Sequence, residues 1–223
     1  MSYRLFYSNG ACSMAPHILL EEIGAPFELT IVSSRGEREG SGTATPEWRA
    51  VNPKGRIPAL LSVRGSAGGS EGLLTELPAI MIFLATSHPE AGLLPSDPAG
   101  LARTLEWMNW LSGNVHAMSF GQIWRAQRYS GDESSLDAIR EQGRRNLGEQ
   151  FAYIESLFGD GRQWALPHGY SIVDPYLLVF FQWGQRIGFS MRDDYPAWAA
   201  SVDRVLARPA VQRVLAREGV EIH

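Results

Sequence analysis

Cys12 is the only cysteine in the 223-residue sequence, and its setting favours a role in chemistry. It follows the turn residues Ser8–Gly10 and opens a predicted helix, a position that lowers the pKa of a thiol and exposes its sulfur. The stretch Cys12–Ala15 resembles a redox Cys-x-x-Cys motif that has lost its second thiol, so it cannot close a disulfide of its own. A lone cysteine is most often an inert buried side chain, but its place after a strand and a turn favours a site residue here.

Asn109 and His116 form a second pattern that could serve a binding site. They lie seven residues apart on a helix predicted from Leu101 to about Arg125, and two turns of about 3.6 residues place them on one face. Gly113 and Phe120 continue this face, which is more polar and open than a core seam. It is typical of the wall of a cleft, although a lone helical histidine is more often a surface or core residue.

The first 85 or so residues alternate between strand and helix signals. Pro16 lies in the first turn of one predicted helix, and Gly24 is a plausible stop for it. The polar, glycine-rich stretches Ser33–Thr45 and Arg64–Gly72 predict a loop and a hairpin connection. The order strand, helix, strand, hairpin, helix is that of a thioredoxin-like unit. The predicted elements are strands at Tyr3–Tyr7, Phe27–Val32, Ile57–Leu61 and Leu73–Thr75, and helices from about Ala15 to Ile23 and from Glu76 to Thr86.

The remainder of the chain, after a proline-rich linker at residues 87–98, predicts helices only. Residues 136–158 carry a regular helical stripe of apolar side chains. Ser171 and Asp174 form a variant of the capping box, and Tyr176–Trp183 is apolar on nearly every side, which predicts a buried central helix. We therefore predict an α+β protein with a thioredoxin-like domain at residues 1–87 and an all-helical bundle domain at residues 98–223.

Composition excludes several classes of function. The 20 basic residues are outnumbered by 24 acidic ones, for a net charge of −4, and form no cluster in the sequence, so no nucleic-acid partner is expected. The apolar run Tyr176–Phe181 is far shorter than a membrane span. One cysteine allows no internal disulfide and supplies too few soft ligands for a zinc site. We expect a cytoplasmic protein without a metal.

Five motifs, in register along nearly the whole chain, resemble those of the bacterial beta class of glutathione transferases. They are Leu5–Tyr7 with Gly10–Ser13 and Ala15–His17; Asn52–Leu60; Leu74–Glu76 with Pro78–Ile80; Trp107–Trp110 with His116; and Ser171–Asp174. The resemblance implies the two-domain architecture predicted above, with glutathione bound against the first domain. It also implies a homodimer that acts in detoxification, with glutathione as co-substrate and no further cofactor.

The resemblance also implies how glutathione is held. Ile57, before a cis Pro58, would pair its backbone with the cysteinyl unit. The backbone N–H at Leu77 would receive the γ-glutamyl carboxylate at a helix N-terminus, and Glu76 would meet the amino group of the same unit. Leu77 departs from the small or hydroxylated residue usual in the family, so one hydrogen bond to the carboxylate should be missing.

The candidates for the sulfur end of this site are Cys12, Ser13, Tyr7 and His116, with Asn109 beside glutathione. Phe120 and Trp124 would form walls for a small apolar electrophile, the second substrate of a conjugation reaction.

Cys12 could act in either of two ways. An ionised Cys12 would repel a glutathione thiolate, so conjugation requires a neutral S–H donor. Thiol–disulfide exchange requires a Cys12 thiolate, and would leave one glutathione on the protein after exposure to oxidised glutathione. The alternatives to a transferase are a glutathione-dependent thiol oxidoreductase or lyase on the same site, and a non-catalytic glutathione-binding module.

Overall fold

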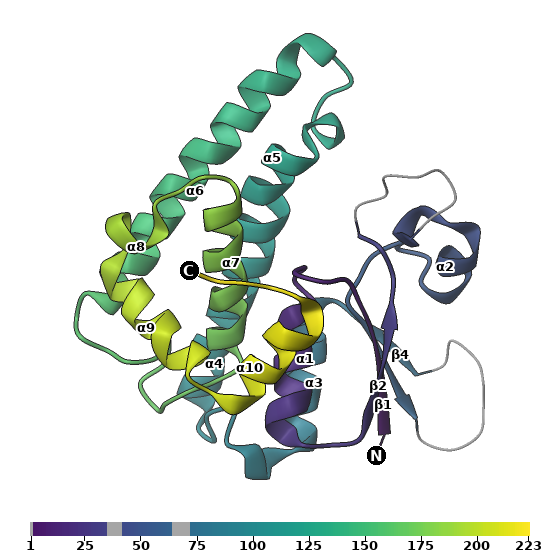
Figure 1. Ribbon diagram of the computed structural model, residues 1–223, viewed down its shortest axis with the longest axis vertical. Coiled ribbons are helices and arrows are strands. Elements are labelled where there is room, and N and C mark those ends of the chain that lie inside the picture. Colours follow the sequence, from purple (N-terminus) through teal and green to yellow (C-terminus); the bar gives the residue numbers. More distant parts are fainter. Residues whose placement is uncertain (1, 35–41, 64–71) are drawn as a thin grey trace.

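The computed structural model describes residues 2–34, 42–63 and 72–223, and its N-terminal part is built on a four-stranded mixed sheet (Figure 1). The strand order is β2-β1-β3-β4, with β1 parallel to β2 and antiparallel to β3, and β3 antiparallel to β4. A parallel pair needs a crossover connection, which α1 (Met14–Ile23) supplies between β1 and β2. The strands are β1 (Ser2–Tyr7), β2 (Phe27–Ile31), β3 (Ala59–Val63) and β4 (Leu73–Thr75). The predicted thioredoxin-like order is confirmed.

The alternation of β1 divides its side chains between the two faces of the sheet. Tyr3, Leu5 and Tyr7 are buried on the face covered by α1 and by α3 (Leu77–Ser87), which lie between the sheet and the helical half (Figure 1). Phe6 lies on the other face, with its ring centroid 4.9 Å from that of Trp48.

Trp48 belongs to α2 (Pro46–Val51), a short helix that the sequence pattern did not predict. Its start has local causes, because the Thr45 hydroxyl accepts a hydrogen bond from the Trp48 N–H at 3.0 Å and Pro46 occupies the first turn. Most of the loop predicted before it, and nearly all of the predicted connection 64–72, lie outside the described residues.

The second half is helical, as predicted. α4, a π-helical segment and α5 run on without a break, and α6 lies alongside them. The predicted apolar stripe of α6 is buried at Leu147, Phe151, Ile154 and Phe158. The helices are α4 (Pro98–Trp110), the π-helical segment (Leu111–Phe120), α5 (Gly121–Trp124), α6 (Leu136–Phe158), α7 (Val173–Arg186), α8 (Met191–Asp194), α9 (Pro196–Leu206) and α10 (Pro209–Glu218).

α7 is the buried centre of this half, and the predicted capping box forms its start. The Asp174 carboxylate accepts the Ser171 N–H at 2.8 Å and the Ala165 N–H at 2.8 Å, while the Ser171 hydroxyl accepts the Val173 N–H at 3.2 Å. These bonds satisfy backbone donors that a helix terminus otherwise leaves open.

α10 returns the chain to the N-terminal half, where it packs on α1, and α7 contacts α1 as well (Figure 1). The two halves therefore share one hydrophobic core. None of the described helices combines the length and apolar character needed to cross a bilayer.

Candidate functional site

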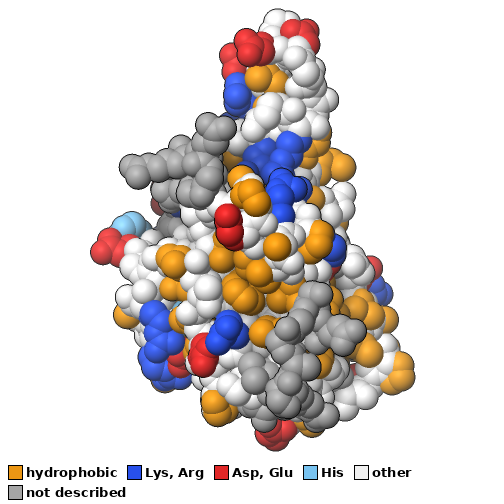
Figure 2. Space-filling model, turned by 90° about the vertical axis from the view of Figure 1, so that its right-hand side faces the viewer, with side chains coloured by type: hydrophobic (Ala, Val, Ile, Leu, Met, Phe, Trp, Pro, Cys, Tyr) orange, Lys and Arg blue, Asp and Glu red, His pale blue; other side chains and the backbone are white. Residues whose placement is uncertain are grey.

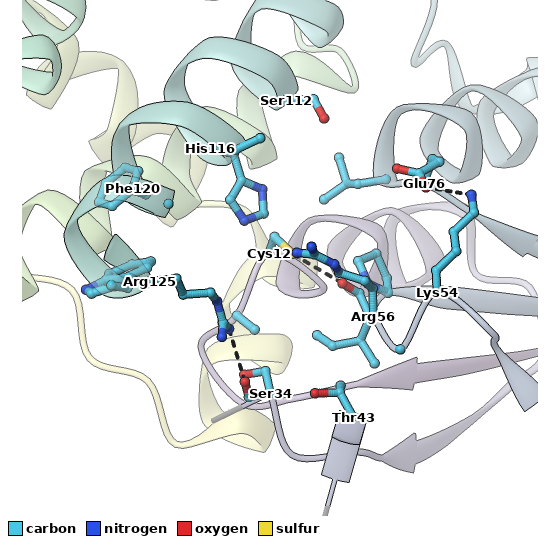
Figure 3. Close-up of a pocket in the computed structure, with 18 of the residues that line it drawn as sticks. Cys12, Ser34, Thr43, Lys54, Arg56, Glu76, Ser112, His116, Phe120 and Arg125 are labelled. Carbon is cyan, nitrogen blue, oxygen red and sulfur yellow. Dashed lines mark hydrogen bonds and ion pairs between the residues drawn. The ribbon is translucent and has the colours of Figure 1, made fainter. Parts of the chain in front are cut away.

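A cleft with a volume of about 840 Å³ lies between the sheet and the helical half (Figure 3). On the sheet side it is lined by the turn after β1, the segment that precedes β3 and the start of α3. The π-helical segment, α5 and the turn after α5 line the opposite side. The cleft thus collects residues from both halves of the chain.

Cys12 lies at the floor of this cleft, in the turn that leads from β1 into α1. Its side chain is only 6% exposed, and its Sγ donates a long hydrogen bond to the Ile57 carbonyl at 3.8 Å. Burial outweighs the backbone amides and the charges of Arg125 and Arg56, and the pKa of Cys12 is raised to about 12. The position of Cys12 at the site agrees with the prediction, but the predicted exposed thiol of low pKa is wrong, because burial outweighs the helix start.

Ile57 and Pro58 join Cys12 at the floor of the cleft. The Ile57–Pro58 peptide bond is cis, as the resemblance implied. The turn before it is held by Asn52, whose side-chain amide donates to the Arg56 carbonyl at 2.8 Å while its Oδ1 accepts the Lys54 N–H at 3.1 Å. These bonds fix the segment that presents the Ile57 backbone to the cleft.

Glu76 and Leu77 occupy the junction between β4 and α3 at one end of the cleft. Glu76 has φ of +71°, a conformation that side-chain-bearing residues rarely adopt and that recurs at functional sites. Its carboxylate pairs with the Lys54 ammonium at 2.6 Å. No side chain caps α3, and the Leu77 side chain is 95% buried, so Leu77 brings only its backbone N–H.

His116 projects from the π-helical segment toward Cys12 (Figure 3). Its Nδ1 lies 3.1 Å from the Tyr176 hydroxyl, and its ring packs edge-on against the rings of Phe180 and Trp183. Burial, together with the charges of Arg56 and Arg125, lowers the pKa of His116 to about 4. The imidazole is therefore neutral at pH 7 and serves as a hydrogen-bond partner and not as a cation.

Asn109 is exposed and does not line the cleft, so the predicted common face with His116 is wrong. The prediction assumed 3.6 residues per turn. Between Leu111 and Phe120 the backbone is π-helical, with bonds five residues back, and turns less per residue. The residues of this segment that line the cleft are Ser112, His116, Ala117 and Phe120.

Tyr7 and Ser13 are also absent from the cleft lining, contrary to their proposed role at the sulfur. The Ser13 hydroxyl closes the preceding turn, since it accepts the Ser8 N–H at 3.1 Å and donates to the Ser8 carbonyl at 3.2 Å. Tyr7 lies against α1, with its ring centroid 5.7 Å from that of His17. The periodicity of β1 turns Tyr7 toward the core and away from the cleft.

Phe120 and Trp124, the predicted co-substrate wall, are both among the residues that line the cleft, but the Phe120 side chain is fully buried. Their ring centroids are 4.8 Å apart, and Trp183 packs edge-on against both at 5.1 and 4.9 Å. Trp124 is 40% exposed, so its face is available to a ligand. No group of three or more His, Cys, Asp or Glu side chains that could hold a metal occurs within residues 2–34, 42–63 and 72–223.

Several residues at the site were missed by sequence reasoning. Arg56, Arg125 and Arg128 line the cleft, and the only local hints were the position of Arg56 next to Ile57 and the spacing of the other two just after Trp124. Glu218 is bonded to the turn before Cys12 from 208 residues away, a contact for which the sequence contains no local signal.

Comparison with known proteins finds relatives of this chain in both sequence and structure. The family model for the N-terminal domain of glutathione S-transferases matches residues 10–87. Glutathione S-transferase GstA of Escherichia coli O157:H7 is 33% identical over 219 residues, which are 98% of this chain and 100% of that protein. A glutathione transferase homologue from Sulfitobacter, solved with bound glutathione, has a TM-score of 0.86 at 26% identity over 98% of this chain and 99% of its own. A bacterial beta-class glutathione S-transferase from Sphingomonas chungbukensis has a TM-score of 0.80 at 28% identity, over 98% and 100% of the two chains.

Proposed function

The chain belongs to the glutathione transferase family, and on that premise we propose that its cleft conjugates the glutathione sulfur to small electrophiles, with Cys12 as a neutral S–H donor. The observation that carries this proposal is the Cys12 thiol itself, buried beside the Ile57 carbonyl. It lies between the uncapped start of α3 and the aromatic pair Phe120 and Trp124. Glutathione and an electrophile would meet at this point.

The proposed orientation of glutathione follows from the donors and acceptors of the sheet side. The Leu77 N–H, at the positive end of the α3 dipole, would receive the γ-glutamyl carboxylate. Glu76 would pair with the γ-glutamyl ammonium, which competes with Lys54 for this carboxylate. The Ile57 backbone would bond to the cysteinyl unit and direct its sulfur toward Cys12 and His116.

At the sulfur, the reaction requires a thiolate at neutral pH, although a free thiol titrates near 8.5. The Cys12 S–H and a ring N–H of His116 are neutral donors that stabilise a bound thiolate without repelling it. Arg56 and Arg125 add a positive potential, since their charges act on both Cys12 and His116. The thiolate then attacks the electrophile, and the thiol proton leaves to solvent.

The redox alternative is less well supported. A Cys12 with a pKa of about 12 is thiolate in only about one molecule in 10⁵ at pH 7, and exchange with a disulfide requires the thiolate. We therefore expect the wild-type protein to remain largely unmodified by oxidised glutathione at pH 7, which reverses the expectation for a redox cysteine. A homodimeric, cytoplasmic detoxification enzyme remains the wider expectation from the family.

Variants of Cys12 test the proposal. Cys12→Ser keeps a donor and should retain most of the conjugation rate with a chloronitroaromatic electrophile. Cys12→Ala should reduce kcat/KM about tenfold, or about 1.4 kcal/mol, because His116 remains. Alkylation of wild-type Cys12 by iodoacetamide should rise with pH through at least pH 9 without a plateau. A plateau below pH 8, together with glutathione transfer to Cys12 and equal loss of disulfide reduction in both variants, would establish the redox role instead.

A further inference from the structure

Basic side chains are concentrated around the cleft to a degree that the composition of the chain does not explain. The sequence has a net charge of −4, yet the described lining of the cleft contains one acidic residue, Glu76, which is paired with Lys54. The basic residues of the lining are Lys54, Arg56, Arg125, Arg128 and Arg186. The end of the helical half where the chain passes from α5 to α6 projects from the molecule (Figure 1). In the space-filling view, basic side chains gather at the base of this projection (Figure 2).

Three of these arginines have no carboxylate partner within the described part of the chain. Arg56 comes from the segment before β3, whereas Arg125 and Arg128 follow α5. Arg56 and Arg125 therefore approach the cleft from opposite sides (Figure 3). Arg125 donates from Nη2 to the Ser34 carbonyl at 3.2 Å, a neutral acceptor. No ion pair to a described Asp or Glu involves Arg56, Arg125 or Arg128.

These charges are close enough to act on one another. Burial lowers the pKa of Arg125 and of Arg128, and the charge of Arg56 lowers both further. Arginine remains charged at any physiological pH, so the cluster retains its mutual repulsion. Like charges that converge in a cleft without a counterion attract an anion of matching shape.

Glutathione alone does not account for this cluster. It carries two carboxylates and one ammonium group, and the proposed orientation places the γ-glutamyl carboxylate at Leu77, at the start of α3. The glycyl carboxylate can engage one of Arg56, Arg125 and Arg128, and the other two then have no carboxylate partner among the described residues. Arg125 directly follows Trp124, the wall assigned to the co-substrate, and Arg128 lies four positions after it.

We propose that the electrophilic co-substrate is itself a carboxylate, whose charged group binds Arg125 and Arg128 while its aromatic or unsaturated body lies against the exposed ring of Trp124, which packs on the buried Phe120. The planar guanidinium fork matches a carboxylate in two parallel hydrogen bonds. This inference rests on the proposed function and names the substrate class of the same site.

The probe for turnover is 4-chloro-3,5-dinitrobenzoate, and its neutral counterpart is 4-chloro-3,5-dinitrobenzamide. In either one the glutathione sulfur forms a C–S bond at the ring carbon, the C–Cl bond breaks, and chloride leaves with the bonding pair. The thiol proton goes to solvent, and the carboxylate or amide is unchanged. The two reactions therefore differ in the charge carried by the ring substituent.

Binding tests the inference independently of turnover. The full chain is saturated with S-methylglutathione, which fills the glutathione site and cannot transfer, and calorimetry compares 3,5-dinitrobenzoate with 3,5-dinitrobenzamide. We expect the benzoate to bind at least about tenfold more tightly. Arg125→Gln and Arg128→Gln should each reduce this preference to about threefold or less, whereas the exposed control Arg140→Gln on α6, where Arg140 pairs with Asp137, should retain it.

Equal affinity for the two ligands, or a preference that survives in both variants, overturns the inference. If S-methylglutathione does not bind, the same comparison on the unliganded chain decides the matter. Turnover, measured as kcat/KM relative to the uncatalysed rate of each chloro compound, is judged separately. A benzoate preference in binding without turnover of either compound would refute the proposed transferase and leave the carboxylate site standing.

Discussion

Glu218, at the end of α10, holds the turn that precedes Cys12, and its removal should both destabilise the fold and loosen that turn. Its Oε2 accepts the Gly10 N–H at 2.8 Å, and its Oε1 lies 2.7 Å from His17 Nδ1, with both side chains fully buried. Gly10 has φ of +62°, and its carbonyl accepts the Trp183 indole N–H at 2.8 Å. The turn is thus bonded on both sides to the helical half.

The magnitude follows from the groups that would be left without partners. Glu218→Ala leaves the Gly10 N–H and His17 Nδ1 buried without this hydrogen-bond partner. Each buried unsatisfied group costs about 1–3 kcal/mol. Two such groups lose their partner at once, so we expect a loss of about 2–6 kcal/mol in the free energy of unfolding. Glu218→Gln keeps one acceptor for Gly10 and should lose about 1–2 kcal/mol.

Urea unfolding of the two variants measures the first effect, with Glu221→Ala as control because that side chain is 86% exposed near the same end of the chain. Hydrogen exchange at Gly10–Cys12 measures the second effect, and the amides there should exchange faster in Glu218→Ala than in the control. A loss below about 1 kcal/mol, or unchanged exchange in this turn, would show that Glu218 does not hold it.

Two further predictions concern the helical half. Gly143→Ala should destabilise the protein by about 1–3 kcal/mol, because a Cβ there would lie 2.9 Å from the Ser119 carbonyl oxygen. Gly148→Ala in the same helix has no heavy atom nearer than 4.0 Å and should be neutral or stabilising by up to about 1 kcal/mol; equal effects in urea would refute the packing argument. The folded-state pKa of His116, about 4, lies below its ordinary 6.5. Between pH 6.5 and pH 4 the unfolded chain therefore binds more protons than the folded chain. The stability that neutral His116 contributes is lost as the pH falls through this range. His116→Gln should therefore lose less stability than the wild type between pH 7 and pH 5, and an identical loss in the two proteins would contradict the assigned pKa.

Much of the fold was predictable because its causes are local. The alternation of Tyr3, Leu5 and Tyr7, the stop at Gly24 and the capping box of Ser171 and Asp174 depend on residues within four positions of one another. Resemblance to a family supplied the position of Cys12 in the cleft and the cis peptide bond at Ile57. The local features follow from short-range spacing within one sequence, whereas the last two rest on the resemblance to a family.

The chemistry of the site was decided by tertiary structure. A cysteine at a helix start predicts a thiol of low pKa, but packing around Cys12 buries it and reverses the shift, since the ionised form loses its hydration. The helical period placed Asn109 beside His116, whereas the π-helical backbone turned it away. Neither the degree of burial nor a local change of helical pitch is encoded in the spacing of residues.

Long-range convergence is the other property that the sequence alone did not determine. The bond between Gly10 and Glu218 spans 208 positions, and Arg56 meets Arg125 and Arg128 only because the helical half folds back over the sheet. Sequence patterns report which face of an element is apolar, and so which elements form. Which charged side chains then meet across a cleft depends on how those elements pack, and here that packing creates the cationic site.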